Sequence, residues 1–412
     1  MDTATLFENQ PFVFLDGAMG TMLQQKGLKA GERTELAALE HPDWLEDIHR
    51  AYAEAGSHII YANTFGANRE KLAGTGHAPE EVIAASVECA KRACAGTGAL
   101  VALDVGPLPR LLQPAGDLTF EEGYALFAEM MEAGERAGAD LVVLETMADL
   151  QELRCALLAA KEHTGLPVLC TMTFEACGRT FMGTGAASFA MTAEALGASA
   201  LGVNCSLGPR QLPELIAELR RHTSLPLIAK PNAGLPRKDG GYDITPEEFA
   251  DSQRALAAAG VRFLGGCCGT APRYVSLLRD ALSGLEGPKA APAVAAALCS
   301  ESAVFPLPIE NRENLHIADD ADEEDILDDA MELVDGDTLL CLTGDSPEAL
   351  AKGVAALRGG VDCPLAVQGT PEAVEHALRL YCGVCGVVGA ENDAALAAAV
   401  KKYGAVSVGS GT

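Results

Sequence analysis

Residues 1–283 predict an α/β fold of the (β/α)8 TIM barrel type, and the rest of the chain predicts a small α/β module behind it. Short apolar runs, often β-branched, alternate with longer amphipathic stretches, as expected for buried parallel strands separated by helices. Nearly every apolar run is followed at once by a polar or glycine-rich segment. In a barrel these segments converge on one face, where active sites of this fold lie. In the main alternative, a doubly wound open sheet, they would spread along an edge.

The apolar runs are too short for typical helices, which favours strands. The predicted strands occupy residues 12–15, 59–62, 100–103, 141–144, 168–172, 201–203, 226–229 and 262–264. The stretches between them have apolar residues at helical spacing. The predicted helices include residues 43–55, 80–95, 121–137, 150–164, 212–222 and 246–259. Strands and helices alternating over this length fit one eight-stranded barrel.

The composition changes after residue 283. Residues 284–305 are interpreted as a linker, because the segment begins rich in Ala, Gly and Pro. Residues 306–412 predict a small module with strands at 338–342, 364–367 and 384–388 and helices at 347–357, 371–381 and 392–402. Three or four βα units cannot close a second barrel. Residues 319–337 include 11 acidic residues among 19 and no basic one, which indicates a solvated helix start or an exposed loop.

The charge of the chain restricts its partners. The formal net charge is −28, and such a surface repels nucleic acid and anionic membranes, so neither is an expected partner. No basic patch and apolar run open the sequence, and no stretch reaches the roughly 18 apolar residues of a membrane span. We therefore expect a cytoplasmic protein. In that reducing compartment, the 13 cysteines predict thiols or metal ligands rather than disulfides.

Three cysteines give the strongest indication of chemistry. Cys205 follows one predicted strand, and the adjacent Cys267 and Cys268 follow another. Three thiolates can supply three ligands of a tetrahedral zinc site and leave the fourth position open for a substrate. The alternative is three buried cysteines that only pack. The Cys382 and Cys385 pair has redox or metal spacing but no second pair, and we interpret it as incidental.

Two carboxylates at predicted strand ends, Asp16 and Glu145, are candidates to hold an ammonium group or to act as acid and base. An ordinary ion pair or a helix cap is the alternative for each. The segment from Asp16 to Thr21 also opens a helix, whose backbone amides can receive a carboxylate. An ammonium site beside a carboxylate site describes an amino acid. With the cysteines, it suggests a substrate that carries both a thiol and an α-amino acid group.

Six motifs together resemble the homocysteine S-methyltransferase family, and most closely the N-terminal homocysteine-binding module of cobalamin-dependent methionine synthase. The motifs are Asp16-Gly-Ala-Met-Gly-Thr21, Ala62-Asn-Thr-Phe-Gly66, Glu145-Thr-Met147, Val203-Asn-Cys-Ser-Leu-Gly-Pro209, Pro231-Asn-Ala-Gly234 and Gly265-Gly-Cys-Cys-Gly-Thr270. The resemblance covers roughly residues 10–282, and the combination of Asn-Cys with Gly-Gly-Cys-Cys-Gly is highly specific.

The resemblance implies a zinc barrel that binds homocysteine. Cys205, Cys267 and Cys268 match the zinc ligands of the family, and Asn232 matches a position that can approach the metal when homocysteine is absent. The remaining matches concern the substrate: Asp16 and Glu145 match positions that hold its amine, and the backbone of Ala18 and Met19 matches the part that receives its carboxylate.

The expected function is zinc-dependent methylation of the homocysteine thiol to methionine, with the methyl group coming from a methylcorrinoid on a separate protein. This chain has no Asp-x-His-x-x-Gly segment, so we expect it to bind no methylcobalamin with a domain of its own. The C-terminal module resembles part of a pterin-binding barrel, and we expect it to dock the corrinoid protein or to form a homo-oligomer contact. The alternatives are a free donor such as S-methylmethionine or betaine, and a non-catalytic barrel that binds zinc or an amino acid.

Overall fold

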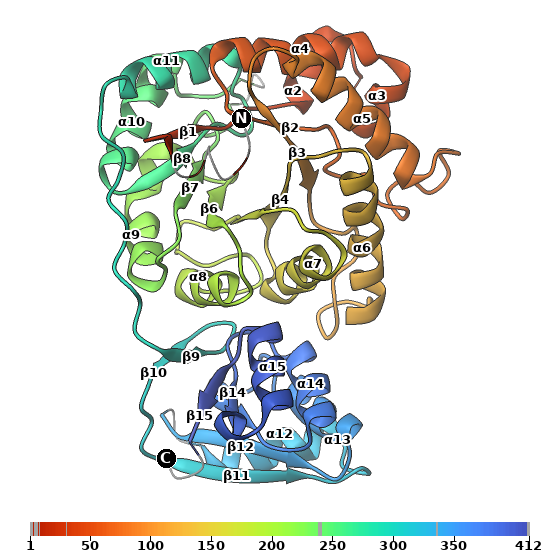
Figure 1. Cartoon of the computed structure of the whole chain (residues 1–412), viewed down its shortest axis with the longest axis vertical. Coiled ribbons are helices and arrows are strands. Elements are labelled where there is room, and N and C mark those ends of the chain that lie inside the picture. Colours follow the sequence, from red (N-terminus) through yellow and green to blue (C-terminus); the bar gives the residue numbers. More distant parts are fainter. Residues whose placement is uncertain are drawn as a thin grey trace.

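The structure is a computed structural model that describes residues 9–409 except 30, 238–240 and 335–336, together with residues 3 and 7. A barrel, coloured from red to green in Figure 1, lies above a smaller module coloured blue. A connecting segment runs down one side from α11 (Pro272–Leu282) to strand β9 (Ala297–Cys299) at the junction of the two parts.

Within the described residues, eight parallel strands form one sheet in the order β1-β8-β7-β6-β5-β4-β3-β2. The strands are β1 (Val13–Phe14), β2 (Ile59–Tyr61), β3 (Leu100–Val105), β4 (Leu141–Met147), β5 (Val168–Met172), β6 (Ala200–Asn204), β7 (Leu227–Lys230) and β8 (Val261–Leu264). The sheet closes where Leu15 pairs with Ile59 and where the His58 amide donates to the Phe14 carbonyl at 2.6 Å. This closure confirms the predicted barrel and rules out the doubly wound alternative.

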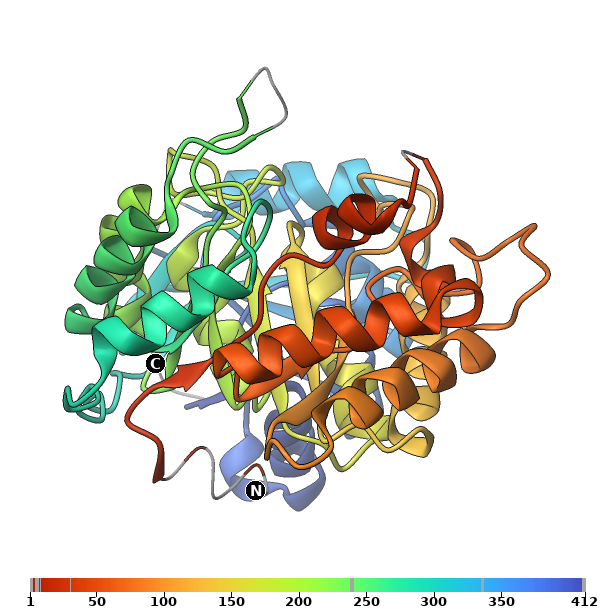
Figure 2. The same cartoon turned by 90° about the horizontal axis from the view of Figure 1, so that it is seen from above.

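Helices surround the sheet, as the view from above in Figure 2 shows for the neighbouring α4 and α5. Besides α11, the helices of this part are α2 (Gly20–Lys26), α3 (Ala37–Glu40), α4 (Pro42–Ala55), α5 (Pro79–Cys94), α6 (Phe120–Arg136), α7 (Leu150–His163), α8 (Ala186–Ala195), α9 (Pro213–His222) and α10 (Pro246–Ala258). The sequence analysis did not predict α8. Its residues are small or apolar except for Glu194, so no helical periodicity marks it.

The barrel interior is apolar at its base and polar at the carboxyl ends of the strands. Ala102, Val143 and Ile228 belong to the inner apolar cluster. Because side chains two positions apart on a strand share a face, the next inward positions are Asp104, Glu145 and Lys230. The strand pattern therefore places a layer of charged side chains on top of the apolar core.

The C-terminal module contains a five-stranded parallel sheet in sequential order. Its strands are β11 (Arg312–Ile317), β12 (Leu339–Gly344), β13 (Leu365–Val367), β14 (Gly386–Val388) and β15 (Val406–Val408). The helices between them are α12 (Glu323–Leu333), α13 (Pro347–Ala356), α14 (Pro371–Leu380) and α15 (Ala394–Tyr403). Each strand pairs with the next one in the chain and a helix lies between them, as in part of a (β/α) barrel. The acidic stretch forms α12 after an Asp322 cap, and its residues 335–336 lie outside the described part.

A β-hairpin covers the face of this sheet that carries no helices. Strand β9 pairs antiparallel with β10 (Val304–Pro306), and Leu298, Phe305 and Ile309 pack with Leu339 and Cys341 in one apolar cluster. The expectation of a linker over residues 284–305 therefore does not fit its second half, which is built into the module. The reason is that its apolar residues find their partners only in the folded sheet.

The module is docked onto the outside of the barrel at α7. The Arg154 guanidinium is buried and donates to the carbonyls of Leu378 at 2.9 Å and Arg379 at 3.4 Å, at the end of α14. A positive charge at a helix carboxyl end is favourable, because the free carbonyls carry partial negative charge. Arg358 adds an ion pair to Asp149 at 2.8 Å. These contacts hold the barrel and the C-terminal module together.

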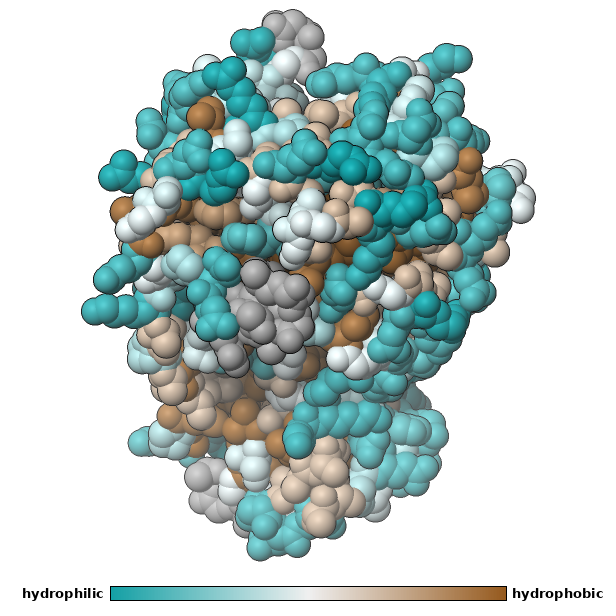
Figure 3. Space-filling model, turned by 45° about the horizontal axis from the view of Figure 1, so that its top comes forward, coloured by the Kyte–Doolittle hydropathy of each residue, from teal (hydrophilic) through white to brown (hydrophobic). Residues whose placement is uncertain are grey.

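The surface agrees with the strongly acidic composition. In the view of Figure 3, hydrophilic side chains cover most of the face and hydrophobic ones form smaller areas between them. In the described part of the chain, no helix has both the length and the apolar character that crossing a membrane requires.

Candidate functional site

The predicted site residues gather in one cavity of about 400 Å³ at the carboxyl ends of the strands. Its lining includes Asp16, Ala18, Met19, Glu145, Cys205, Cys267 and Cys268, together with Lys230 and Asp104. Asn232 lies beside it, where its Oδ1 accepts the Cys268 amide at 3.1 Å. Segments far apart in the sequence thus form one pocket because each follows a barrel strand.

The three cysteines form a compact group. Their sulfurs all lie within 4.8 Å of one another, and those of Cys205 and Cys268 are 4.0 Å apart. Hydrogen bonds from the Cys267 and Cys268 thiols hold the pKa of Cys205 well below its usual range. The same hydrogen bonds raise the pKa of Cys267, and burial adds to that rise. The three sulfurs therefore form one closely spaced group of a kind that can hold a cation.

The turns that present these groups have an uncommon backbone. Thr146, Cys205 and Ser206 have φ values of 62°, 58° and 47°, in the left-handed region that non-glycine residues rarely adopt. Such conformations cost on the order of 1 kcal/mol or more each and concentrate at functional sites. Here they bend the chain at the irregularity near the end of β4 and turn it sharply after β6, next to Glu145 and Cys205, which both line the pocket.

Asn204 stabilises both turns, and the sequence analysis did not assign it a role. Its Oδ1 accepts the Thr146 amide at 2.8 Å, while its Nδ2 donates to Thr146 Oγ1 at 2.8 Å and to Glu145 Oε2 at 3.3 Å. One side chain thus connects the carboxylate turn with the cysteine turn. Its place directly before Cys205 in the Asn-Cys motif was the available sequence clue.

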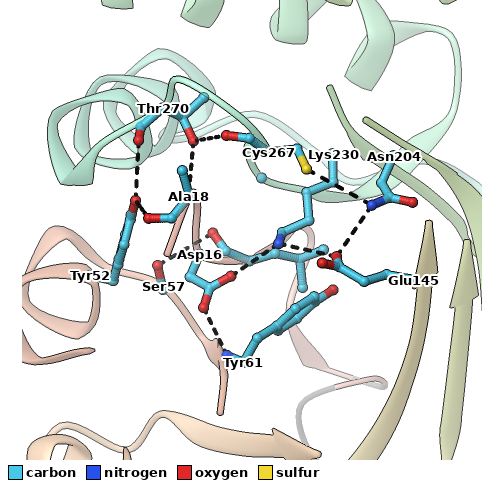
Figure 4. A network of polar contacts seen from close by, with 12 residues as sticks. Asp16, Ala18, Tyr52, Ser57, Tyr61, Glu145, Asn204, Lys230, Cys267 and Thr270 are labelled. Carbon is cyan, nitrogen blue, oxygen red and sulfur yellow. Dashed lines mark hydrogen bonds and ion pairs between the residues drawn. The ribbon is translucent and has the colours of Figure 1, made fainter. Parts of the chain in front are cut away.

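Lys230 is the second residue that the sequence analysis missed. Its Nζ lies 3.3 Å from Asp16 Oδ1 and 3.4 Å from Glu145 Oε2, and 4.0 Å from the centre of the Tyr61 ring (Figure 4). Burial lowers the pKa of Lys230, but the neighbouring Glu145 and Asp16 carboxylates outweigh it and raise that pKa well above its usual range. The lysine is therefore a buried cation between the two predicted ammonium-binding carboxylates.

The backbone after β1 forms the other side of the pocket. The Ala18 amide donates to Thr270 Oγ1 at 3.2 Å, and the Ala18 carbonyl accepts the Tyr52 hydroxyl at 2.9 Å (Figure 4). The Ala18 amide thus already has a partner. Helix α2 begins at Gly20, and its described first turn carries no acidic residue and no side-chain cap. A substrate carboxylate is electrostatically favoured at such a helix start.

Tyr242 approaches the cysteine group from the segment after β7. Its hydroxyl is hydrogen-bonded to Cys268, and burial followed by the nearby Cys268 raises the pKa of Tyr242 to about 12. A Cβ on Gly269 would lie 2.2 Å from the Tyr242 ring, so only glycine leaves space for it. The glycine after the cysteine pair therefore lets an aromatic side chain cover the thiols.

Asp16 gives the site an expected pH dependence. Burial raises the pKa of Asp16 from 3.8 to about 6, with Lys230 and the Tyr61 amide opposing the rise. Above that pKa the carboxylate is ionised and attracts an ammonium group. Below it, at pH 5, only about a tenth stays ionised. For a thiol substrate that carries an α-amino group, we expect kcat/KM to fall about tenfold between pH 7 and 5, relative to the same thiol without the amine. Parallel pH profiles of the two thiols would contradict this.

The fold and the pocket define a barrel enzyme whose catalytic face combines thiols with buried charged groups. The chain belongs to the homocysteine S-methyltransferase family, whose sequence profile matches residues 13–282. The family resemblance of the motifs is thereby confirmed.

Two methionine synthases match about two thirds of this chain. The methionine synthase of Mycobacterium tuberculosis is 31% identical over 298 residues, which are 66% of this chain and 25% of that protein. The methionine synthase of Mycobacterium leprae is 30% identical over 289 residues, or 63% of this chain and 23% of that protein. This chain thus spans about a quarter of either relative.

A solved structure supports the barrel assignment. The homocysteine methyltransferase MmuM of Escherichia coli, in its metallated form, superposes with a TM-score of 0.59 at 25% identity. The match covers 67% of this chain and 98% of MmuM. About a third of this chain therefore lies outside the part that the two proteins share.

Proposed function

We propose that this chain methylates the thiol of homocysteine to give methionine and that it uses zinc bound by Cys205, Cys267 and Cys268. The observation that carries the proposal is the position of the three sulfurs in the same pocket as Asp16 and Glu145. Tetrahedral zinc with bonds of about 2.3 Å places its sulfur ligands roughly 3.8 Å apart. The 4.0 Å between the Cys205 and Cys268 sulfurs is close to that spacing.

The zinc ion would lower the pKa of the incoming thiol, so that its sulfur is a nucleophile at neutral pH. The residues around the ion then have separate tasks. Asp16 and Glu145 hold the substrate ammonium, and the backbone after Ala18 receives the carboxylate. Asn232 lies beside the cysteines, since its Oδ1 accepts the Cys268 amide at 3.1 Å, and it could therefore leave the metal when the substrate thiol binds.

For the methyl donor we propose a methylcorrinoid carried by a separate protein. The similarity to methionine synthases favours it, although this chain spans only a quarter of those proteins. A free donor is the second candidate, because MmuM shows that a homocysteine methyltransferase can consist almost entirely of the part shared with this chain. Among free donors, betaine is less favoured than S-methylmethionine. The aromatic residues among the described pocket lining are Tyr61 and Phe65, and the Tyr61 ring already carries Lys230. Because the family consists of enzymes, we set the non-catalytic alternative aside.

The experiment that tests the proposal measures methionine formation from homocysteine by the zinc-loaded chain. Methylcobalamin, a methylated corrinoid protein and S-methylmethionine are compared as donors, and a chelated sample serves as the control. We expect turnover with the corrinoid donors and its loss on chelation. Turnover with S-methylmethionine alone would overturn the donor assignment, and turnover that survives complete zinc removal would overturn the metal assignment.

The C-terminal module has a place in this proposal as a shortened pterin-barrel relative. We propose that it docks the corrinoid protein or forms a contact between two copies of the chain. Deleting residues 300–412 tests both roles when the truncated chain is shown to be folded, because the module's contacts with α7 also contribute to stability. If transfer from every donor and the oligomeric state stayed unchanged, neither role would stand.

A further inference from the structure

The two carboxylates proposed for the substrate ammonium already hold an ammonium group of the protein. Lys230 Nζ is almost equally far from Asp16 and Glu145, at 3.3 Å and 3.4 Å. Figure 4 shows this amine between the two carboxylates, above the Tyr61 ring. A substrate ammonium that reaches hydrogen-bond distance of both carboxylates would therefore compete with Lys230 for the same position.

The Coulomb energy argues against both cations sharing that position. Two like charges that approach to hydrogen-bond distance repel strongly, and burial strengthens that repulsion because water screens it less. Among the described residues that line the pocket, Lys230 is the sole basic side chain, so no second cation of the protein needs to be accommodated. The lysine has to move when the amino acid binds.

Asp104 offers the lysine a second partner in the same cavity. It stands at the inward position of β3, its side chain is 7% exposed, and its Oδ1 has no hydrogen-bond partner among the described residues. A buried carboxylate oxygen without a partner is costly, which makes it a strong acceptor for a nearby ammonium. Burial, together with the neighbouring Glu145, raises the pKa of Asp104 well above its usual range, and the charge of Lys230 opposes that rise. An ammonium group that moves closer to Asp104 would therefore favour the ionised form of this carboxyl.

We propose that Lys230 occupies the binding position of the substrate ammonium and leaves it when the amino acid binds. Without substrate it pairs with Asp16 and Glu145, and when the amino acid binds it moves to Asp104. This inference rests on the proposed function, because it assumes an amino acid acceptor. Lys230 and Asp104 are then positioning residues that set the affinity for the substrate amine. The apparent affinity falls in proportion to the fraction of molecules in which Lys230 has left the two carboxylates.

The test is a double-mutant cycle on the full-length, zinc-loaded chain with Lys230→Met, Asp104→Asn and the double variant. Dissociation constants are measured by calorimetry for homocysteine and for 4-mercaptobutanoate, and KM and kcat are measured where turnover is seen. We expect Lys230→Met to tighten homocysteine binding about tenfold and Asp104→Asn to weaken it about tenfold, equal to about 1.4 kcal/mol each. In the Lys230→Met background, Asp104→Asn should change affinity by less than about twofold.

Three controls make the cycle decisive. Binding of 4-mercaptobutanoate should change little in each variant, because it has no ammonium. Lys91→Met removes a lysine that pairs with Asp140 at 2.7 Å outside the pocket and should leave both affinities unchanged. Thermal unfolding checks each fold, and Lys230→Gln replaces Lys230→Met if the latter is unstable.

Weaker homocysteine binding by folded Lys230→Met would overturn the proposal, because Lys230 would then support the substrate. An equal effect of Asp104→Asn in both backgrounds would also overturn it, since Asp104 would then contact the substrate directly. If the wild-type chain neither binds nor methylates homocysteine, the proposed function itself fails, which is a separate outcome from either of these.

Discussion

Replacing Cys267 by alanine is expected to remove bound zinc and to lower methyl transfer to homocysteine by at least about 1000-fold, or about 4 kcal/mol in the transition state. The Cys267 sulfur lies within 4.8 Å of the sulfurs of Cys205 and Cys268. Alanine leaves two sulfurs, which do not make a zinc site with one open position. The substrate thiol would then stay largely protonated at neutral pH.

Zinc content per chain measures the loss directly and does not depend on the choice of methyl donor. Cys170→Ala is the matched control, since Cys170 is a buried thiol on β5 outside the cysteine group. It should keep one zinc per chain. A Cys267→Ala chain that is folded and still holds stoichiometric zinc would show that the metal is bound elsewhere.

The barrel could be predicted because its strands are buried on both faces and are therefore continuously apolar. The predicted strand at residues 168–172 agrees with β5, and the others agree to within a few residues. The strands of the C-terminal module were harder to predict. Strand β11 carries Arg312, Glu313 and His316 because it lies at the sheet edge, so its sequence lacks the pattern of a buried strand. Strand β9 is too short to be recognised without its partners.

The position of the candidate site was also readable from the sequence, because the residues after parallel strands must meet at one face. The thiols and carboxylates could be named from their chemistry. Lys230 could not, because a lysine after a short strand resembles an ordinary surface charge. Its inward direction follows from the two-residue alternation with Ile228, which requires the exact strand register. Tyr242 reaches Cys268 only through the folded loop, and no spacing in the sequence indicates it.

A chain cut after residue 283 is expected to aggregate or to unfold at least about 10 °C below the full-length protein, since each kcal/mol shifts Tm by about 2–4 °C in a domain of this size. The reason is the burial of α7. Every residue from 150 to 160 is buried, whereas the outer helices of a barrel normally keep a polar face. The module covers the second face of α7, and Arg154 and Gln151 donate to carbonyls at the end of α14.

The comparison with MmuM sharpens this prediction, because a barrel of this family can make up nearly a whole chain. The requirement for the module therefore comes from the side chains of α7 and not from the fold. A full-length chain cleaved by a protease site placed within residues 284–292 is the matched control, since the module stays docked through its contacts. Scanning calorimetry and light scattering compare the two. A soluble, monomeric 1–283 fragment that unfolds at the full-length temperature would mean that the α7 contacts contribute little to stability, and would leave docking of a partner as the remaining role of the module.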